Sequence, residues 1–547
     1  MSRGHAIALG GGLAAALTLL CWSVFGPSGR ISHSTPLFAI ATAALWAAMV
    51  FLEGRAGRSL PVFTPLFAGM ALAATLLLVG PEVPGALRGD EVRGWSTYHY
   101  YVGSKYFADT GFFDLYGATL AADDAFVAGG GDPKEGWFDA DRARDMRSYK
   151  LRPRAEIVAS FDASSMDPER LAALGADSRF FRRHEHPRDR RKLVQDLGFN
   201  PGPPWMLLGV PLSNAIDAGG RGFGLITGSD VAMHVLAFAA LWWGFGLRVA
   251  CIALLWMLTV PINRGRLIGG YFNYDWLAAA ALAFAAWHRD RPALSALALS
   301  WAAMTRVFPG LMALPLLFVA GRGLIGGARN PKVMRFATVF VLACALLFGA
   351  SHATGRGAGT WPEWTEKIRI HSEHHPKTGS KRVGLGRLVL HHPRPGKFWR
   401  ATSRPSPAQA TSSHRRKLVV AALGLGLLGL ALRRRPLDEA MLAMLFAAWI
   451  GSTSSRYYAS IWVLLFALPT LGPRAGPGRW AAAVLLGMTL VWHAPPTLTA
   501  QYLALNYEAL AMFAGLCLLW LWGDRRGRAA GEPSLDAPAP ALDHSSR

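Results

Sequence analysis

Long apolar runs without charge recur along almost the whole chain, and they constrain its fold more than any other feature. Runs that are long enough to cross a bilayer, or nearly so, occupy 6–26, 36–53, 62–80, 229–246, 248–262, 273–287, 335–351, 417–432, 437–454, 457–471, 479–493 and 507–523. Only 17% of the residues are charged, against about 25% in soluble domains. The sequence therefore predicts an all-α fold, a polytopic transmembrane helical bundle.

Two shorter apolar pieces lie between 293 and 320, and Thr305, Arg306 and Pro309 interrupt them. Each piece is short for a full span, so we expect a bent pair or a re-entrant hairpin here. With this pair counted as two crossings, basic clusters such as 322–335 fall on the cytoplasmic side, as the positive-inside rule requires. The pattern predicts about 12–14 crossings with both termini inside.

Two long connections fall on the outer side of this topology. The first holds 20 of the 35 acidic residues and is long enough to fold as a large helical outer loop domain after the third helix. The second is basic and rich in His, Pro and Gly, and the polar tail is expected to be disordered. The expected divisions are 1–80 (three helices), 81–203 (outer domain), 204–351 (core), 352–417 (second outer loop), 418–523 (C-terminal helices) and 524–547 (cytoplasmic tail).

The net charge of +22 suggests nucleic acid at first sight. Most Lys and Arg residues flank apolar runs, however, which is typical of membrane topology, so we expect membrane lipids and no nucleic acid as partners. The four cysteines (Cys21, Cys251, Cys344 and Cys517) lie inside apolar runs and indicate neither a disulfide framework nor a zinc site. No Walker phosphate loop or Rossmann fingerprint is present in the sequence.

An acidic pair, Asp90-Glu91, stands where the chain leaves the third apolar run, and the aromatic segment HYYVGSKYF (99–107) follows it. Such an amphipathic segment is able to lie in the membrane interface, where Tyr and Trp are enriched. A carboxylate at this level is suited to act as general base on an acceptor hydroxyl. The alternative is that both acids only solvate a helix end.

The acidic pair, the Tyr-rich segment and the following Gly-x-x-x-Leu-Tyr resemble the GT-C superfamily of integral membrane glycosyltransferases. The resemblance implies a polyprenyl-phosphate sugar donor, Asp90 or Glu91 as catalytic base, and an outer-face site in a bacterial inner membrane. His99, Tyr100 and Lys105 would then contact the substrate. The chain departs from the simplest family pattern because three apolar runs, and not one, precede the acidic loop.

Polar residues around 264–276 fit a site on the same face. Arg264 and Arg266 lie on the outer side against the local charge rule, and their guanidinium groups match phosphate oxygens. Ordinary contact with lipid headgroups is the alternative. Asn273 and Asp275 open the next apolar run, so Asp275 is either a helix N-cap or a functional ionisable residue.

Arginines also mark two later positions. Arg306 lies at the break between the two short apolar pieces, where it is expected to contact a lipid phosphate or to pair with Asp275. Arg456 and Tyr457 lie at the outer end of the run at 457–471. They would contact phosphate or a sugar hydroxyl, or belong to an aromatic belt with one snorkelling arginine.

A metal or cofactor is not indicated. The histidines His371, His374, His375, His391 and His392 lie in a Pro- and Gly-rich setting that disfavours a stable helix, and no third-ligand pattern is clear. The acids Asp123/Asp124 and Asp139/Asp141 are expected to be solvated, with a divalent-ion site as the alternative.

The sequence leads to one main hypothesis and one rival. The first is a glycosyltransferase that moves a sugar from a polyprenyl-phosphate donor to a lipid, glycan or protein acceptor. The rival is a transporter or flippase for an anionic lipid or lipid-linked sugar. A third option is a noncatalytic scaffold for envelope assembly, which would need none of the buried charges. A catalytic base should share a cavity with Arg306, and a solvated Asp90 far from any cavity would argue against the enzyme hypothesis. A transporter should instead have its charged groups near the bilayer midplane, along a path to both sides.

Overall fold

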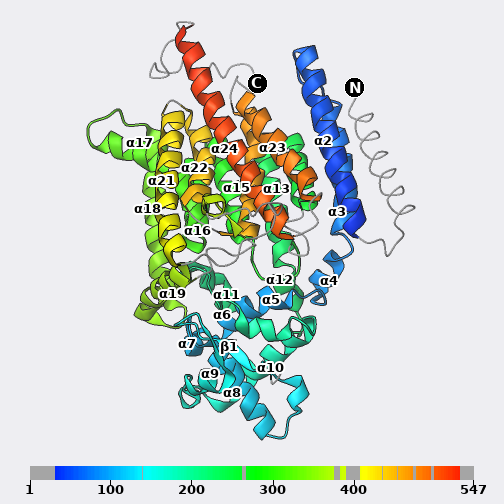
Figure 1. Cartoon of the computed structure of the whole chain (residues 1–547), viewed down its shortest axis with the longest axis vertical. Helices are drawn as coiled ribbons and strands as arrows, with labels where there is room; N and C mark the ends of the chain where they lie inside the picture. Colours follow the sequence, from blue (N-terminus) through cyan, green and yellow to red (C-terminus); the bar gives the residue numbers. More distant parts are fainter. Residues whose placement is uncertain are drawn as a thin grey trace.

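The computed structural model consists of a large helical bundle with a smaller helical domain at one end (Figure 1). It describes residues 31–137, 140–260, 267–374, 382–389, 407–433, 435–451, 454–471, 476–493 and 498–529. Helices make up 78% of the structure, and the strands of its described residues form two short pairs. The prediction of an all-α fold is therefore confirmed, while the first apolar run, 6–26, lies outside the described residues.

The bundle is built from long apolar helices with large side chains buried between them, among them Trp256, Trp276 and Trp520. Other apolar side chains, such as Leu346 and Phe318, point outward and are more than half exposed, which suits a lipid-facing surface. The bundle elements are α2 (Ile31–Ala56), α3 (Phe63–Leu78), α13 (Ser229–Phe245), α14 (Leu247–Thr259), α15 (Asp275–His288), α16 (Pro292–Thr305), η7 (Phe308–Ala313), α17 (Leu314–Leu324), α18 (Pro331–Ala350), α21 (Pro407–Leu432), α22 (Leu437–Gly451), η10 (Arg456–Thr470), α23 (Gly476–His493) and α24 (Leu498–Ala529).

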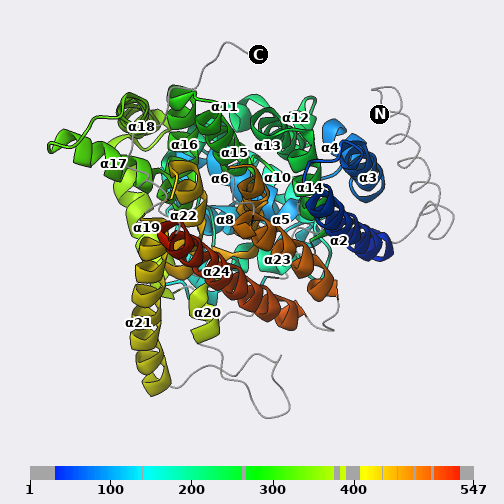
Figure 2. The same cartoon turned by 90° about the horizontal axis from the view of Figure 1, so that it is seen from above.

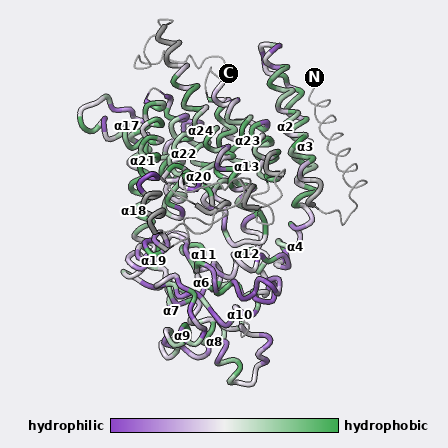
Figure 3. Tube along the Cα trace, in the orientation of Figure 1, coloured by the Kyte–Doolittle hydropathy of each residue, from purple (hydrophilic) through white to green (hydrophobic). Residues whose placement is uncertain are grey.

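Within the described part of the chain, four helical stretches are long and apolar enough to cross a membrane. They are Thr35–Ala56, Phe223–Phe245, Pro331–Ala353 and Tyr502–Gly523. Several other apolar helices, including α14 and α16, are shorter. Hydrophobic residues dominate the bundle and hydrophilic residues the opposite end (Figure 3). These helices indicate a membrane-associated protein, and the number of crossings stays a prediction.

The chain breaks its helical course at Arg306. Helix α16 ends at Thr305, and the backbone of Arg306 is extended, with φ −143° and ψ 101°. The 3-10 segment η7 then begins at Phe308 with Pro309 in its first turn. Because proline lacks a backbone N–H, it is tolerated only at the start of such a segment. The break thus leaves the side chain of Arg306 between two helical pieces.

The outer domain follows α3 and has its own aromatic core. Its elements are α4 (Val83–Arg88), α5 (Gly94–Thr97), the π-helical η1 (Tyr98–Val102), α6 (Gly103–Lys105), α7 (Phe107–Thr110), α8 (Leu115–Ala128), η2 (Pro133–Glu135), β1 (Arg142–Arg144), β2 (Leu151–Pro153), α9 (Arg154–Ala159), η3 (Ala163–Ser165), α10 (Pro168–His184), η4 (Arg190–Gln195), η5 (Pro203–Trp205), α11 (Met206–Ala215) and α12 (Phe223–Thr227). Strands β1 and β2 pair antiparallel, with Ala143 opposite Arg152.

The Tyr-rich segment lies inside this core, so the expectation that it lies in the membrane interface is wrong. Tyr98 and Tyr101 are fully buried. Their ring centroids lie 6.5 and 5.4 Å from that of Phe181, and Tyr98 lies 5.8 Å from Trp137. Aromatic partners from α10 and from the loop after η2 bury these rings better than a lipid interface would.

The second outer loop also folds against the outer domain. It contains the short segments η8 (Ser351–Ala353) and η9 (Gly357–Gly359), helix α19 (Thr360–His374), strand β3 (Arg382–Val383) and helix α20 (Leu385–Val389). The carboxylate of Glu363 accepts a hydrogen bond from the Phe112 N–H at 2.8 Å. Strand β3 pairs antiparallel with β4 (Ser454–Ser455), which precedes η10.

Two helix ends differ from the sequence-based expectations. Helix α19 continues through His371 to His374, where the composition predicts no stable helix; its packing on the outer domain supplies what local propensity lacks. Helix α24 continues through Ala529, past residue 524, where the disordered tail is predicted to begin. Helix-favouring Arg and Ala residues follow Asp524, so the last turns continue the helix.

Candidate functional site

A cavity of about 240 Å³ lies where the bundle meets the outer domain. Helix α19, strand β3 and the loop before η5 contribute to it from the outer side, and η7, η10 and α22 from the bundle. Its lining residues are Asn200, Thr305, Arg306, Val307, Phe308, Trp364, Ile368, Val383, Leu445, Ala448, Trp449, Tyr458, Ala459, Ile461 and Trp462.

Arg306 is the cationic residue of this lining, and it is tied to the outer domain. Its guanidinium group donates hydrogen bonds to the Tyr100 hydroxyl and, at 3.2 Å, to the Thr305 carbonyl. The guanidinium carbon lies 5.5 Å from the centroid of the Tyr100 ring. Arg306 is 6% exposed. A buried cation is costly in such surroundings unless an anion or several acceptors compensate it.

The remaining wall of the cavity is largely apolar and aromatic. The ring centroids of Phe308 and Tyr458 are 4.9 Å apart, and Trp276 packs on both rings from behind. The indole N–H of Trp449 donates to the side-chain oxygen of Asn506 at 3.3 Å, so the ring is held in place. One cation in an apolar chamber suits a ligand with an anionic head and a hydrocarbon body.

Asp275 lies next to this chamber, at the start of α15. It is 3% exposed, and its Oδ2 accepts a hydrogen bond from the Trp301 indole at 2.9 Å. No hydrogen bond from the described residues reaches Oδ1, and Arg306 attracts the carboxylate electrostatically. The N-cap position belongs to Tyr274 and Asp275 makes no capping bond, so the capping interpretation of Asp275 is wrong.

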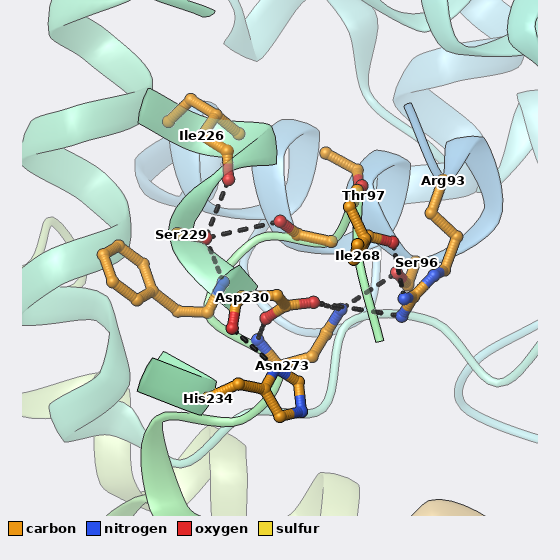
Figure 4. Close-up of polar contacts among 12 residues, drawn as sticks. Arg93, Ser96, Thr97, Ile226, Ser229, Asp230, His234, Ile268 and Asn273 are labelled. Carbon is orange, nitrogen blue, oxygen red and sulfur yellow. Dashed lines mark hydrogen bonds and ion pairs between the residues drawn. The ribbon is translucent and has the colours of Figure 1, made fainter. Parts of the chain in front are cut away.

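A second polar cluster, around Asp230, joins the outer domain to the bundle (Figure 4). Asp230 is fully buried at the start of α13. Its Oδ1 accepts the Asn273 backbone N–H at 2.7 Å, and its Oδ2 lies 3.9 Å from the guanidinium of Arg93. Asn273 also donates to the Ser96 hydroxyl at 3.1 Å. The Asn273 side of this cluster is therefore bonded to residues 43 and 177 positions earlier in the chain, through the Asp230 carboxylate and the Asn273 side-chain amide.

Backbone contacts complete this cluster. Arg93 donates from its backbone N–H to the Gly269 carbonyl at 2.9 Å and from its side chain to the Ile268 carbonyl at 2.6 Å. Gly269 has φ +79°, and a Cβ there would lie 2.8 Å from the Glu91 carbonyl oxygen. Only glycine fits this close approach. The cluster is therefore a closely bonded joint, in which the Nε of Arg93 is a group without a hydrogen-bond partner among the described residues.

The acidic pair is exposed and lies outside the cavity. Asp90 forms an ion pair with Arg88 at 2.9 Å, and both side chains are 67% exposed. Glu91 is exposed as well, and neither acid lines the chamber of Arg306. The expectation that the base and Arg306 share one cavity is therefore not met in this conformation.

Several other predicted contacts lie beyond what the structure describes. Arg264 and Arg266 fall outside the described residues. Arg456 opens η10 and Tyr457 follows it, next to the cavity-lining Tyr458. The side chains of both are outside the described part. Asn273 and Tyr100 are placed, in the Asp230 cluster and against Arg306 respectively.

His99 and Lys105 serve the outer domain itself. The ring nitrogens of His99 are bonded to the Trp95 carbonyl and the Tyr116 hydroxyl, both at 2.7 Å, and burial lowers the pKa of this histidine. Lys105 forms ion pairs with Asp177 at 3.0 Å and with Asp217 at 3.3 Å. These partners account for both side chains without a ligand.

Two buried cations of the second outer loop escape notice in the sequence. Lys367 of α19 is fully buried against Met146 and the Tyr149 ring. Burial lowers its pKa to about 7, an effect that Asp196 opposes. Arg387 of α20 is 2% exposed, and its Nε and Nη2 have no hydrogen-bond partner among the described residues. The sequence of this loop shows only a basic composition, so no local pattern distinguishes Lys367 and Arg387 from the solvated basic residues around them.

No group of three or more potential metal ligands occurs among the described residues. His371 is engaged through Nδ1 with the Tyr149 hydroxyl at 2.9 Å. Asp123 is 1% exposed, accepts the Trp137 N–H at 2.7 Å and pairs with Arg154. The expectation that Asp123 is solvated is thus wrong, because its carboxylate satisfies buried donors of the domain core.

Comparisons with known proteins add no relative: no family model, no curated protein and no solved structure matches this chain. The geometry of the two sites therefore carries the functional argument.

Proposed function

We propose that the protein is a bacterial inner-membrane glycosyltransferase that crosses the bilayer 12–14 times and uses a polyprenyl-phosphate sugar donor. The outer domain faces away from the cytoplasm, and the donor enters the cavity at Arg306 from the membrane. Its phosphate lies against the Arg306 guanidinium and its hydrocarbon chain along the wall of Trp449, Tyr458 and Trp462.

The observation that carries this proposal is that Arg306 is the one cation among the described residues that line an apolar cavity between bundle and outer domain. A lipid-linked phosphate combines the two properties that such a chamber recognises, a charged head and a hydrocarbon body. Arg387, four residues after the cavity-lining Val383 in the chain, is proposed as an additional positive charge for the phosphate. Arg264, Arg266 and Arg456 are proposed as further phosphate contacts.

The transfer step needs a base and a leaving group. The acceptor hydroxyl attacks the anomeric carbon, a new glycosidic C–O bond forms, and the bond from that carbon to the phosphate oxygen breaks. A carboxylate takes the hydroxyl proton, and the polyprenyl phosphate leaves with the bonding pair. Arg306 stabilises the charge that develops on the phosphate, so one carboxylate and a cation suffice.

Two carboxylates are candidates for this base. The resemblance to GT-C enzymes favours Asp90 with Glu91, whose exposure gives a water-borne acceptor direct access. Proximity to Arg306 favours Asp275, whose Oδ1 accepts no hydrogen bond among the described residues. We propose Asp90 as the base, because the resemblance places the catalytic carboxylate in the first outer loop.

A second function is supported by a specific observation. None of the described residues that line the cavity is a carboxylate, and a transporter or flippase for an anionic lipid or lipid-linked sugar needs a cation and an apolar wall without a base. In that case substitution of either acid leaves lipid movement intact, whereas substitution of Arg306 abolishes it.

The test is a transfer assay in nanodiscs with radiolabelled polyprenyl-phosphate sugars and total membrane lipids as acceptors. Wild type should form a labelled product, while Asp90→Asn retains donor binding and loses turnover by about 100-fold or more. Loss of turnover in Asp275→Asn with an active Asp90→Asn would assign the base to Asp275. Donor binding without turnover in wild type, with lipid movement across the bilayer, would establish the transporter instead.

A further inference from the structure

A second cavity, of about 230 Å³, lies at the end of the bundle remote from the outer domain. It is enclosed by α2, α14, the end of η10 and the start of α23. Helices α2 and α3 meet at this end, and α3 then runs back to α4 and the outer domain, so the two cavities lie at opposite ends of the bundle (Figure 1). In the proposed topology this second end faces the cytoplasm.

Charged side chains lie on one part of its lining. Arg248 and Glu53 form an ion pair at 2.7 Å. Arg248 also donates to the Leu60 carbonyl at 2.9 Å and to the Thr64 hydroxyl at 3.1 Å. Its donors are therefore directed into the protein, and the pair carries no net charge. The pair fixes the junction between α2, α3 and α14.

Arg479 is in a different situation. It stands in the first turn of α23, lines the same cavity and is exposed. No hydrogen bond or ion pair from the described residues holds its guanidinium group. Because Arg248 and Glu53 cancel, Arg479 gives the described residues of this lining a net charge of +1, next to the positive end of a helix dipole.

The opposite wall is apolar. Trp46, Met49 and Phe466 line it. Phe51 and Leu52, on the neighbouring face of α2, are 60% and 45% exposed, so this helix presents a lipid-facing surface directly beside the cavity. At the edge of the bundle, α2 and α3 have no further described helix outside them (Figure 2).

We propose that this cavity binds one anionic phospholipid, with the phosphate on Arg479 and an acyl chain along Trp46, Met49 and Phe466. Among the described lining residues, Arg479 is the cation without an ion-pair partner, so it complements a headgroup with one net negative charge. Basic pockets between helices at the cytoplasmic side bind such headgroups. The site is separate from the outer cavity and is independent of the proposed transferase activity.

The experiment uses full-length protein, delipidated in detergent and analysed by native mass spectrometry. Phosphatidylglycerol, phosphatidylethanolamine and inorganic phosphate serve as separate probes. Wild type should retain phosphatidylglycerol in preference to the zwitterionic lipid, and Arg479→Gln should weaken that binding about fivefold, the effect of one arginine near a charged headgroup. The matched control, Arg322→Gln, changes another exposed arginine, at the end of α17, and should leave the binding unchanged.

A second variant separates a headgroup site from a merely structural cavity. Glu53→Gln keeps an oxygen for Arg248 and for the Leu60 N–H but raises the net charge of the cavity, so binding of phosphatidylglycerol should become tighter. Equal binding of both lipids, or equal losses in Arg479→Gln and Arg322→Gln, would overturn the proposal. Inorganic phosphate that competes as well as the lipid would also overturn it, since the apolar wall would then contribute nothing.

Discussion

Arg93 and Arg306 both lie on the outer side of the bundle, and both are largely shielded from water, but their surroundings differ. Arg93 belongs to a joint in which Asp230, Asn273 and the backbone of 268–269 are bonded to one another. Arg306 faces a cavity and is held from one side by the Tyr100 hydroxyl. An arginine on the outer side of a membrane protein, against the positive-inside rule, is therefore not by itself evidence of a ligand site. Whether its guanidinium group is bonded to protein groups or faces a cavity distinguishes the two cases.

The largest effect on stability is expected for a substitution in the joint around Asp230. Asp230→Asn removes the negative charge beside Arg93 and should lower the free energy of unfolding by about 3 kcal/mol, since it leaves a buried cation without its counter-charge. Unfolding in detergent, followed by circular dichroism, measures this loss. Asp217→Asn is the matched control: its side chain is 87% exposed, and the change should be below about 1 kcal/mol. Equal losses would remove the distinction between joint and surface.

A pH series tests how the second outer loop is held. The pKa of Lys367 is lowered by burial to about 7, while the unfolded chain keeps an ordinary lysine pKa. Between these values the unfolded state binds the extra proton, so stability rises with pH, by roughly 2 kcal/mol from pH 7 to pH 9. Below pH 7 both states are protonated and this contribution levels off.

Lys367→Met provides the comparison for that series. Methionine fills the same apolar position without a charge, so the variant should be more stable than wild type at pH 7 and should lack most of the rise. An unchanged slope in the variant would show that other groups cause the pH dependence.

Substitution at the cavity should affect binding more than stability. Arg306→Gln should weaken binding of a polyprenyl phosphate by roughly 10- to 100-fold, because a hydrogen bond to a charged group contributes about 1.5–3 kcal/mol. The free energy of unfolding should change by about 1–2 kcal/mol, less than in Asp230→Asn, since the bonds to Tyr100 and Thr305 and part of the attraction on Asp275 are lost. Isothermal titration in nanodiscs measures the first quantity, and thermal unfolding the second. A stability loss as large as that of Asp230→Asn would make Arg306 part of a second structural joint.

The smallest effect is expected at the hydroxyl that orients this arginine. Tyr100→Phe keeps the ring beside the guanidinium and removes the hydrogen-bond acceptor. Lipid-phosphate affinity should fall about 3- to 5-fold, the contribution of an ordinary hydrogen bond of roughly 1 kcal/mol. Tyr458→Phe is the control within the same cavity and retains the aromatic wall. Unchanged affinity in Tyr100→Phe would mean that Arg306 is positioned without Tyr100.

The helical fold could be predicted from the long apolar runs, because burial in lipid and burial between helices both require long uncharged segments. Local polarity also distinguishes the outer domain from the bundle. The contacts of the site are harder to predict from the sequence. Tyr100 and Arg306 are 206 residues apart, and no pattern in either segment predicts that they are hydrogen-bonded. Asp230 lies within an apolar helix start and Lys367 within a basic loop, so only packing distinguishes them from ordinary neighbours.

The most direct test of the central claim, that the Arg306 cavity holds a lipid phosphate, is photo-crosslinking. A polyprenyl phosphate with a diazirine close to the phosphate would be bound to the protein in nanodiscs, irradiated and mapped by mass spectrometry. Adducts should appear on cavity residues such as Trp449 and Tyr458, and Arg306→Gln should remove them. Adducts that persist in Arg306→Gln, or that form only away from the cavity, would contradict the claim.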